Sequence, residues 1–245
     1  MSKFGLIGKH IDYSFSKSYF TKKFENEGLP HSYQNFDINT IEEFPKIIKS
    51  ISNLKGLNVT IPYKEVIMPF LDKLDETANI IGAVNTIKLT KKGKLIGYNT
   101  DYYGFKKSII PYLKPNHKKA LILGTGGASK AIAYALKQLG ITHSYVSRVS
   151  SNAANYTYDT LSEAIIKEHQ IIINCTPLGT HPNVNDYPKI PYDAISKTHI
   201  LFDLIYNPQE TKFLSIGKQK GATICNGLNM LELQAEKAWE IWSHA

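Results

Sequence analysis

The chain has 245 residues and 42% of them are hydrophobic, which is enough apolar material for one large domain or two smaller ones and excludes an intrinsically disordered chain. The formal net charge is +8, but the lysines are spread over many segments. No stretch interleaves arginine with aromatic residues, so we expect no nucleic-acid partner. The charge instead favours a solvated basic surface, and the alternative is a field that attracts anionic ligands such as phosphates or carboxylates.

The sequence shows neither a membrane segment nor a secretion signal. Its longest apolar runs, 120–123 and 171–173, are far shorter than the roughly 20 residues that span a bilayer. The N-terminal segment has no basic region followed by a long apolar stretch, so we expect a cytoplasmic protein without a membrane partner. Cys175 and Cys225 form no C-x-x-C pair and have no histidine at metal-ligand spacing. We therefore expect reduced, structural thiols and no metal.

The first hundred residues alternate between strand-like and helix-like segments. Strands are predicted at 4–8, 32–38, 57–61, 83–89 and 95–98, and helices at 18–27 and 40–51. Thr40 and Glu43 form a capping box at the start of the second helix. The segment 91–94 is predicted to form a hairpin turn between the last two strands. This part of the chain therefore forms one α/β unit.

A second α/β unit begins near Lys118. Strands are predicted at 120–123, 144–147, 171–174, 200–204 and 222–225, and helices at 129–139, 160–168, 211–218 and 230–242. Repeated strand–helix units indicate a parallel sheet that helices cover on both faces. Because both halves alternate in this way and the sequence has no internal repeat, it predicts two doubly wound α/β domains.

A glycine-rich loop follows the first strand of the second unit and opens a helix, which is the context of a dinucleotide-binding loop. Gly124 permits the tight turn, and Gly126 lets the backbone approach a pyrophosphate. The helix start then offers unpaired N–H groups and the positive end of its dipole. Ser129 is small enough to pack against the sheet and can cap the helix. The cofactor-binding candidates are Gly124, Thr125, Gly126, Gly127 and Ala128. A merely tight strand–helix turn is the alternative.

The end of the next strand distinguishes NAD from NADP. NAD sites usually carry Asp or Glu there to hold the 2′-hydroxyl of the ribose. The segment 145–151 contains no acid, and Arg148 lies at the matching position. Because a guanidinium group suits a 2′-phosphate, NADP is favoured over NAD. A surface arginine without a ligand is the alternative.

Polar side chains follow predicted strands of the first unit. The segment 58–64, which includes Thr60, ends one strand and places Lys64 just beyond it. Asn85 and Asp101 follow two other strands. Ligand sites in open α/β sheets lie at the carboxyl ends of strands. A ketone reduced by hydride needs a proton donor at the nascent alkoxide, and a lysine beside a carboxylate can supply the proton. Lys64 and Asp101 are the candidates for this pair, and a surface ion pair is the alternative.

Eight segments combine into a more specific pattern. They are Ser-Phe-Ser at 14–16, Asn-Val-Thr-Ile-Pro-Tyr-Lys at 58–64, Gly-Ala-Val-Asn-Thr at 82–86, Gly-Tyr-Asn-Thr-Asp at 97–101, Gly-Thr-Gly-Gly-Ala-Ser at 124–129, Asn-Cys-Thr-Pro-Leu-Gly at 174–179, Asp-Leu-Ile-Tyr-Asn-Pro at 203–208 and Asn-Gly-Leu-Asn-Met-Leu at 226–231. In order and spacing these segments resemble the motifs of the shikimate dehydrogenase family. The resemblance covers nearly the whole chain.

The resemblance implies a substrate site made of hydroxyl, amide and charged side chains. The family pattern assigns the substrate carboxylate to Ser14 and Ser16 and gives Tyr206 a place facing the substrate. It assigns the ring hydroxyls to Thr60, Asn85, Asp101 and Gln234. Lys64 becomes the acid/base, coupled to Asp101. The implied reaction is the reversible NADPH-dependent reduction of 3-dehydroshikimate to shikimate, in the biosynthesis of chorismate and aromatic amino acids.

The resemblance also implies an NADP site. The loop 124–129 and Arg148 hold the dinucleotide, and Leu204 and Gly227 line the nicotinamide pocket. Glu76 matches an acidic position that some members place near the cofactor. Residues 1–101 plus about 228–245 form the substrate-binding and catalytic domain, and residues 102–227 form the Rossmann-like NADP domain. A monomer or a homodimer is expected.

Two positions depart from the family pattern. The family commonly has Asn-Arg-Thr at 147–149, whereas this chain has Ser-Arg-Val, losing a hydroxyl donor that Ser150 or Ser151 can replace. Lys17 stands where a proline is usual. Three alternatives remain open: a quinate/shikimate dehydrogenase that accepts NAD, a non-catalytic ligand-sensing relative, and a folate-linked dehydrogenase of similar architecture. The sensor is disfavoured because Lys64 and Asp101 are both present.

Overall fold

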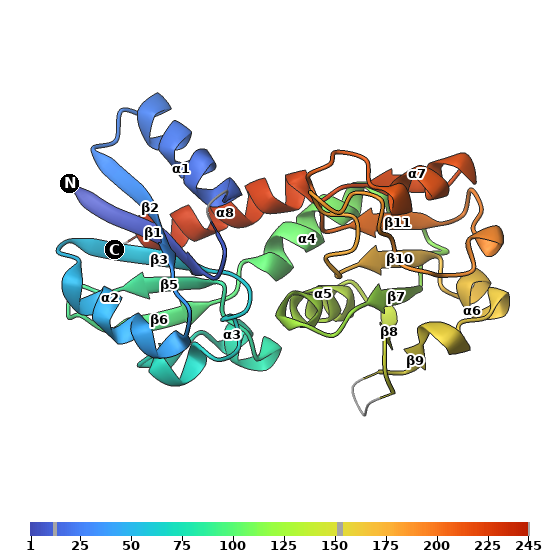
Figure 1. The fold of residues 1–245 in the computed structure, drawn as a ribbon, viewed down its shortest axis with the longest axis horizontal. Helices are drawn as coiled ribbons and strands as arrows, with labels where there is room; N and C mark the ends of the chain where they lie inside the picture. Colours follow the sequence, from blue (N-terminus) through green and yellow to red (C-terminus); the bar gives the residue numbers. More distant parts are fainter. Residues whose placement is uncertain (12–13, 151–153, 245) are drawn as a thin grey trace. The chain divides into compact units, whose positions relative to one another are not determined.

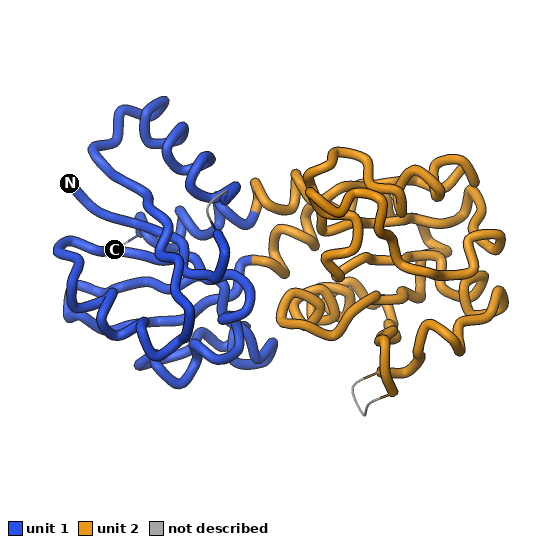
Figure 2. The backbone as a smooth tube through the Cα atoms, viewed as in Figure 1, with its two compact units in different colours: residues 1–100, 234–245 blue, residues 101–233 orange. Residues whose placement is uncertain are grey.

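The computed structural model describes residues 1–11, 14–150 and 154–244. The chain divides into two compact units, one formed by Met1–Thr100 with Gln234–Ala245 and the other by Asp101–Leu233 (Figure 2). Each unit is built on its own six-stranded sheet, which confirms the predicted α/β class (Figure 1). Helix α8 (Leu228–Ser243) begins in the second unit and ends in the first. None of the helices in the described residues is long and apolar enough to cross a bilayer.

The sheet of the first unit has the strand order β2-β1-β3-β5-β6-β4. Its strands are β1 (Ser2–Gly8), β2 (His31–Asp37), β3 (Leu54–Val59), β4 (Lys73–Leu74), β5 (Thr86–Leu89) and β6 (Leu95–Tyr98). β1 is parallel to β2 and β3, but β5 is antiparallel to both β3 and β6. A wholly parallel, doubly wound sheet is therefore the wrong expectation for this unit. The hairpin predicted at 91–94 makes β6 antiparallel to β5, and β5 itself enters the sheet antiparallel to β3.

Helices cover both faces of this sheet because side chains alternate along β1. Phe4 and Leu6 pack beneath α1 (Phe15–Asn26) and the last turns of α8. Ile7 points to the opposite face, which is covered by α2 (Phe44–Ser50) and α3 (Glu76–Ile81). Figure 1 shows α1 and α8 on one side of the sheet of this unit.

The contact between α8 and β3 requires a glycine. A Cβ atom on Gly56 would lie 2.2 Å from Nε1 of Trp242, so a larger residue would displace the indole ring. That Nε1 donates a hydrogen bond to the carbonyl oxygen of Ile87 at 2.9 Å. The end of α8 is thus fixed to the sheet by packing and by a buried hydrogen bond.

The sheet of the second unit is parallel throughout, with the order β12-β11-β10-β7-β8-β9. Its strands are β7 (Lys119–Leu123), β8 (Thr142–Ser147), β9 (Tyr156–Thr157), β10 (Ile171–Asn174), β11 (Ile200–Asp203) and β12 (Thr223–Cys225). This is the Rossmann order, in which the direction of winding reverses between the first and fourth strands, here β7 and β10. The predicted doubly wound Rossmann-like architecture is confirmed for this unit.

Two helical layers enclose this second sheet. One layer contains α4 (Asp101–Ile109) and α5 (Gly127–Gln138), which pack against Ile122 and Ile173. The other contains α6 (Glu163–Glu168) and α7 (Lys212–Gln219), which pack against Leu121. Short 3-10 helices complete the chain: η1 (Ile41–Glu43), η2 (Met68–Phe70), η3 (Ile110–Tyr112), η4 (Tyr158–Thr160) and η5 (Tyr192–Ala194).

Among the α-helices and β-strands of the described residues, four are absent from the sequence prediction: α3, α4, β4 and β9. β4 and β9 have two residues each, too few for a period of two to be recognised. α3 has six residues, and its start is marked only by Asp75, whose Oδ1 accepts the N–H of Thr77 at 2.9 Å. The helix predicted at 40–51 is a 3-10 turn followed by α2. Its predicted capping contact is confirmed, since Glu43 Oε1 accepts the N–H of Thr40 at 3.1 Å.

A buried histidine lies just before β7. His117 is 5% exposed, its Nδ1 accepts the N–H of Lys114 at 2.9 Å, and its Nε2 lies 3.1 Å from the carbonyl oxygen of Thr198. Nε2 therefore carries the proton of a neutral ring. Burial, chiefly, lowers the pKa of His117, and the nearby Lys114 and His199 act in the same direction.

We expect the stability of the second unit to fall on acidification. An unfolded chain protonates His117 at its ordinary pKa of about 6.5, whereas the folded unit resists protonation. The unfolded state then binds more protons, so the unfolding free energy falls as pH drops below about 6.5. Thermal unfolding between about pH 8 and pH 5 measures this slope. His117→Gln should reduce this slope; a slope equal to that of the unchanged protein would contradict the prediction.

Candidate active site

The predicted substrate-binding residues of the first unit lie at one edge of its sheet. Thr60 directly follows β3, and its N–H donates to the carbonyl oxygen of Ile7 at 2.8 Å. Asn85 immediately precedes β5, where the sequence analysis placed it after a strand. Because β5 is antiparallel to β3, its first residue reaches the edge at which β3 ends. Although Asn85 precedes β5 instead of following a strand, Thr60 and Asn85 still lie at the same edge of the sheet.

Asn85 is the centre of a buried hydrogen-bond network. It is 2% exposed, and its Oδ1 accepts the N–H of Thr100 at 2.7 Å. Its Nδ2 donates to Oγ1 of Thr100 at 3.0 Å and to Oε1 of Gln234 at 3.3 Å. The structure thus brings together two predicted substrate-binding residues that are 149 positions apart. The network fixes the amide orientations, so the polar edge is pre-organised.

The network continues across the sheet to the start of α1. Asn58 Nδ2 lies 3.3 Å from Oγ1 of Thr86, and its Oδ1 accepts the hydroxyl of Tyr33 at 2.8 Å. Burial raises the pKa of Tyr33 well above its usual range, and a hydrogen bond with Ser16 partly opposes the shift. The Tyr33 hydroxyl therefore stays protonated and connects Ser16 to the buried edge.

Ser14 has a structural role of its own. It is the N-cap of α1, where its Oγ accepts the N–H of Lys17 at 3.1 Å and donates to Oδ1 of Asn35 at 2.8 Å. An N-cap of this type leaves the remaining first-turn N–H groups directed away from the helix. The start of α1 is consequently suited to an anion such as a carboxylate.

Sequence analysis gave Tyr33, Asn58, Thr86 and Thr100 no role. Asn58, Thr86 and Thr100 fall within quoted motifs, so they carried a signal, but Tyr33 lies outside every motif. Its partner is set by the parallel register of β1 with β2 and β3, which pairs Phe4 with Tyr33 and Leu6 with Asn58. Register of this kind is not encoded in local spacing.

The predicted acid/base pair is divided between the two units. Lys64 lies in the first unit, half-buried after a turn in which Tyr63 donates its N–H to the carbonyl oxygen of Thr60 at 2.9 Å. The Lys64 carbonyl accepts the N–H of Val84 at 2.7 Å. Asp101 is 5% exposed and is the first residue of α4 in the second unit, where the helix dipole favours its negative charge.

Glu76 lines a cavity of about 610 Å³ in the first unit together with Asn79 and Tyr98. It is exposed in the first turn of α3. Burial raises the pKa of Tyr98, and nearby Asp75 adds to the shift. The cavity therefore joins a carboxylate, an amide and a phenol at one end of β6.

The glycine-rich loop follows β7 at the point where the winding of the second sheet reverses. Gly124 has φ +105°, a conformation that favours glycine, and its N–H donates to the carbonyl oxygen of Val146 at 2.8 Å. Gly126 is the N-cap of α5, and a Cβ there would meet no atom within 4 Å. Ser129 is 1% exposed, as its small size predicts, but it does not cap the helix: α5 begins earlier, and the Ser129 hydroxyl donates to the carbonyl oxygen of Gly126 at 2.6 Å.

Arg148 is exposed at the end of β8, one residue after the strand. The preceding Ser147 closes a local turn, since its Oγ accepts the N–H of Val149 at 3.1 Å. Burial raises the pKa of Tyr158 to about 12, and the charge of Arg148 partly opposes this. The guanidinium group is thus presented to solvent beyond a fixed turn. Ser151, one of the two possible replacement donors, lies outside the described residues.

Leu204 and Gly227 are brought into contact in the second unit. The N–H of Gly227 donates to the carbonyl oxygen of Ile205 at 3.0 Å. A Cβ on residue 227 would lie 2.1 Å from the carbonyl oxygen of Leu204, so this position admits only glycine. Tyr206 follows in the same turn, half-buried, and burial raises its pKa. The turns after β11 and β12 therefore form one compact surface.

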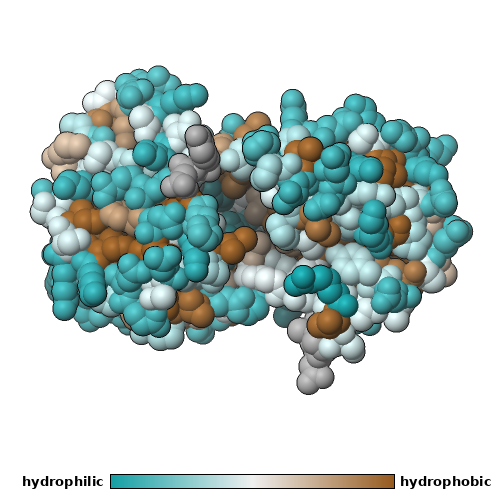
Figure 3. Space-filling model, viewed as in Figure 1, coloured by the Kyte–Doolittle hydropathy of each residue, from teal (hydrophilic) through white to brown (hydrophobic). Residues whose placement is uncertain are grey.

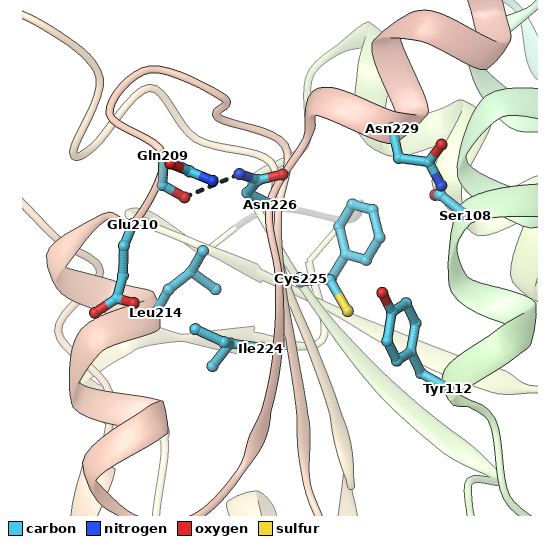
Figure 4. Close-up of a pocket in the computed structure, with 10 residues that line it drawn as sticks. Ser108, Tyr112, Gln209, Glu210, Leu214, Ile224, Cys225, Asn226 and Asn229 are labelled. Carbon is cyan, nitrogen blue, oxygen red and sulfur yellow. Dashed lines mark hydrogen bonds between the residues drawn. The ribbon is translucent and has the colours of Figure 1, made fainter.

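Another cavity of the second unit, of about 490 Å³, lies around β12 (Figure 4). Figure 4 shows Cys225 and Tyr112 on one side of the strand and Leu214 and Glu210 on the other. It contains none of the predicted site residues. Both cysteines are free, and burial raises the pKa of Cys225 to about 12.

Comparison with known proteins agrees with the motifs. Residues 6–87 match a family model described as the shikimate dehydrogenase substrate binding domain. The chain is 42% identical to the shikimate dehydrogenase (NADP(+)) of Clostridium beijerinckii, with 99% of this chain and 92% of that protein covered. The chain belongs to the shikimate dehydrogenase family. The resemblance inferred from the eight motifs is thereby confirmed.

Two solved structures of this family are similar to this chain over nearly its whole length. A shikimate 5-dehydrogenase from Thermus thermophilus, in complex with NADP(H) and shikimate, is 30% identical with a TM-score of 0.88 and covers 99% of this chain and 94% of its own. A shikimate 5-dehydrogenase from Listeria monocytogenes, in complex with shikimate and NAD, is 28% identical with a TM-score of 0.88. The match covers 100% of this chain and 92% of that protein. Family members thus differ in the dinucleotide they were solved with.

Removing the hydroxyl of Tyr33 tests how much the buried network contributes to the stability of the first unit. Tyr33→Phe leaves Oδ1 of Asn58 without its donor in a side chain that is 3% exposed. We expect the unfolding free energy of the first unit to fall by about 1–3 kcal/mol, the usual cost of an unpaired buried polar group. Denaturant unfolding measures it. The exposed neighbour variant Gln34→Ala should change stability by less than about 0.5 kcal/mol; a Tyr33→Phe protein as stable as this control would contradict the prediction.

Proposed function

We propose that this chain is an NADP-dependent shikimate dehydrogenase that reversibly reduces 3-dehydroshikimate to shikimate in the biosynthesis of chorismate and aromatic amino acids. Its relationship over nearly the full length of a curated shikimate dehydrogenase (NADP(+)) carries the proposal. The pre-organised polar edge around Asn85 supports it, because a polyhydroxylated acid needs many fixed hydroxyl and amide partners. A ligand that lacks one hydroxyl would leave buried partners unpaired, which gives strong discrimination.

The substrate would be held by both ends. We assign its carboxylate to the hydroxyls of Ser14 and Ser16 at the start of α1, where the helix N-terminus also favours negative charge. Its ring hydroxyls are assigned to Thr60, Asn85 and Gln234 and to Asp101 of the second unit. Tyr206 is assigned a place facing the substrate. The bonds among Asn85, Thr100 and Gln234 orient these amides before the substrate arrives.

Lys64 is the proposed acid/base. In the reducing direction its ammonium group gives a proton to the ketone oxygen as the hydride reaches the carbonyl carbon, and in the oxidising direction the neutral amine takes the hydroxyl proton. Asp101 of the second unit is the proposed partner of Lys64 in moving this proton. The backbone bond between Lys64 and Val84 holds the lysine turn in place.

NADP fits the second unit. The open side of Gly126 and the first turn of α5 suit a pyrophosphate, and the exposed Arg148 suits a 2′-phosphate. When bound, the dinucleotide supplies the hydride. Leu204 and Gly227 are assigned to the nicotinamide end, and Glu76 of the first unit to the neighbourhood of the cofactor. We further propose a cytoplasmic protein that is a monomer or a homodimer, which light scattering of the purified protein distinguishes.

The first test is an absorbance assay of nicotinamide reduction, with shikimate or quinate as the substrate and NADP or NAD as the cofactor. Reduction with shikimate and NADP supports the proposal. Efficient reduction with NAD or quinate instead assigns the protein to the broader quinate/shikimate dehydrogenases. No reduction in any combination, with NADP still bound, contradicts the catalytic assignment and favours a ligand sensor.

Lys64→Ala should lower kcat by at least about 10²-fold, the usual contribution of a general acid/base, while NADPH binding and the thermal midpoint stay near those of the unchanged protein. Lys55→Ala is a matched control because Lys55 is an exposed lysine in β3. Steady-state kinetics and a fluorescence titration with NADPH measure both quantities. Turnover by Lys64→Ala equal to that of the control would exclude Lys64 as the acid/base.

Arg148→Ala should raise the KM for NADP by about 10- to 100-fold, because a charge-assisted hydrogen bond contributes about 1.5–3 kcal/mol. The KM for NAD should change little, since NAD has no 2′-phosphate. Lys137→Ala removes the same charge from the exposed side of α5 and serves as the control. Equal losses with NADP and NAD would show that Arg148 does not recognise the 2′-phosphate.

A further inference from the structure

A carboxylate with no assigned role lies at the end of β11. Asp203 is 0% exposed, and so is Asn174 at the end of the neighbouring β10. Thr211, the N-cap of α7, is 1% exposed beside them. Three fully buried polar side chains therefore meet in the second unit, where the loops after β10 and β11 leave the sheet.

Both oxygens of Asp203 are engaged. Oδ1 accepts Nδ2 of Asn174 at 3.1 Å and the N–H of Ile205 at 3.1 Å. Oδ2 accepts the hydroxyl of Thr211 at 2.6 Å. The carboxylate thus joins three separate segments: the end of β10, the turn after β11 and the start of α7.

Its partners extend the network into the surrounding loops. Oδ1 of Asn174 accepts the N–H of Thr176 at 3.0 Å and its hydroxyl at 2.6 Å. Oγ1 of Thr211 accepts the N–H of Leu214 at 3.3 Å, so the same hydroxyl caps α7. Each hydrogen bond of this network restrains a loop or the start of a helix.

Burial of the Asp203 carboxylate carries a free-energy cost for the folded state. Burial raises the pKa of Asp203 to about 6, and the bonds from Thr211, Ile205 and Asn174 only partly oppose the shift. A well-packed apolar group at such a place is often as stable as, or more stable than, a buried charge. Stability therefore does not explain why a carboxylate occupies position 203. Its place beside Leu204 suggests a role in holding that residue.

The turn that Asp203 restrains carries the residues assigned to the nicotinamide end. Its bond to the N–H of Ile205 fixes the peptide after Leu204, and the carbonyl of Ile205 accepts the N–H of Gly227 at 3.0 Å. Leu204 and Gly227 are in close backbone contact. The position of both residues consequently depends on one carboxylate.

We propose that Asp203 is a positioning residue that, with Asn174 and Thr211, holds the Leu204–Gly227 surface in the geometry required for hydride transfer. The proposal rests on the proposed function for its kinetic consequence. The pyrophosphate loop and Arg148 bind the rest of the dinucleotide through other segments, so a disturbed Asp203 should affect the nicotinamide more than overall affinity. A displacement of about 1 Å can cost up to about 10²-fold in rate.

The test compares Asp203→Asn and Thr211→Val with Thr211→Ser, which keeps the hydroxyl. Ile166→Val is the stability control, because Ile166 is 0% exposed in α6 and belongs to the apolar core. For each protein we would measure the thermal midpoint, the Kd for NADPH, the KM for shikimate and kcat. The emission of bound NADPH is a further readout, since it reports the nicotinamide environment without turnover.

We expect Asp203→Asn to lower kcat by about tenfold or more, with the Kd for NADPH and the KM for shikimate within about threefold of the unchanged protein. Thr211→Val should lower kcat less and Thr211→Ser should restore it. The NADPH emission change should shrink in step with kcat. A lower thermal midpoint with unaltered kcat and emission, as expected for Ile166→Val, would overturn the proposal.

The two proposals can fail separately. If the unchanged protein turns over no shikimate, the proposed function fails, and the NADPH emission of Asp203→Asn still decides whether Asp203 positions the nicotinamide surface. If the unchanged protein is active and Asp203→Asn loses kcat only as far as it loses NADPH affinity, the positioning role fails and the proposed function stands.

Discussion

Buried polar side chains at the ends of strands impose the main constraint on this molecule. Each must find its hydrogen bonds inside the protein, because an unpaired buried group costs about 1–3 kcal/mol. Asn85 meets the constraint in the first unit and Asp203 in the second, each at the centre of a network that joins segments distant in sequence. The surrounding loops can then take few other conformations, which makes these edges suitable for binding small polar ligands. These networks are internal, whereas the surface seen in Figure 3 is mostly hydrophilic with hydrophobic residues scattered over it.

Much of the fold follows from the sequence because alternation of strand and helix is a local signal. The glycine-rich loop, the hairpin at 91–94 and the α/β class were all predicted on that basis. The antiparallel placement of β5 was not, although the hairpin implied it, because the repeated strand–helix pattern suggested a parallel sheet. Asn85 was consequently placed after a strand rather than before one. The sequence also indicated that Ser129 could cap the helix after the glycine-rich loop, whereas the N-cap of α5 is Gly126.

The candidate residues came from motifs, but their partners did not. The contact between Tyr33 and Asn58 depends on the register of three strands, and the carboxylate of Asp203 meets Thr211 only because α7 starts against β11. Spacing along the chain identifies residue types suited to a reaction, whereas the contacts that orient them depend on tertiary packing.

Helix α8 has a consequence for synthesis. The core of the first unit includes Ala235, Ala238 and Trp242, yet the rest of that unit lies before residue 101. The ribosome makes the whole second unit before it makes these three residues. Until α8 has been made, α1 alone covers this face of the sheet, and Phe4 and Phe20 lack their contacts with Trp242. The core of the first unit can therefore be completed only after the second unit has been synthesised, although most residues of the first unit come earlier in the sequence.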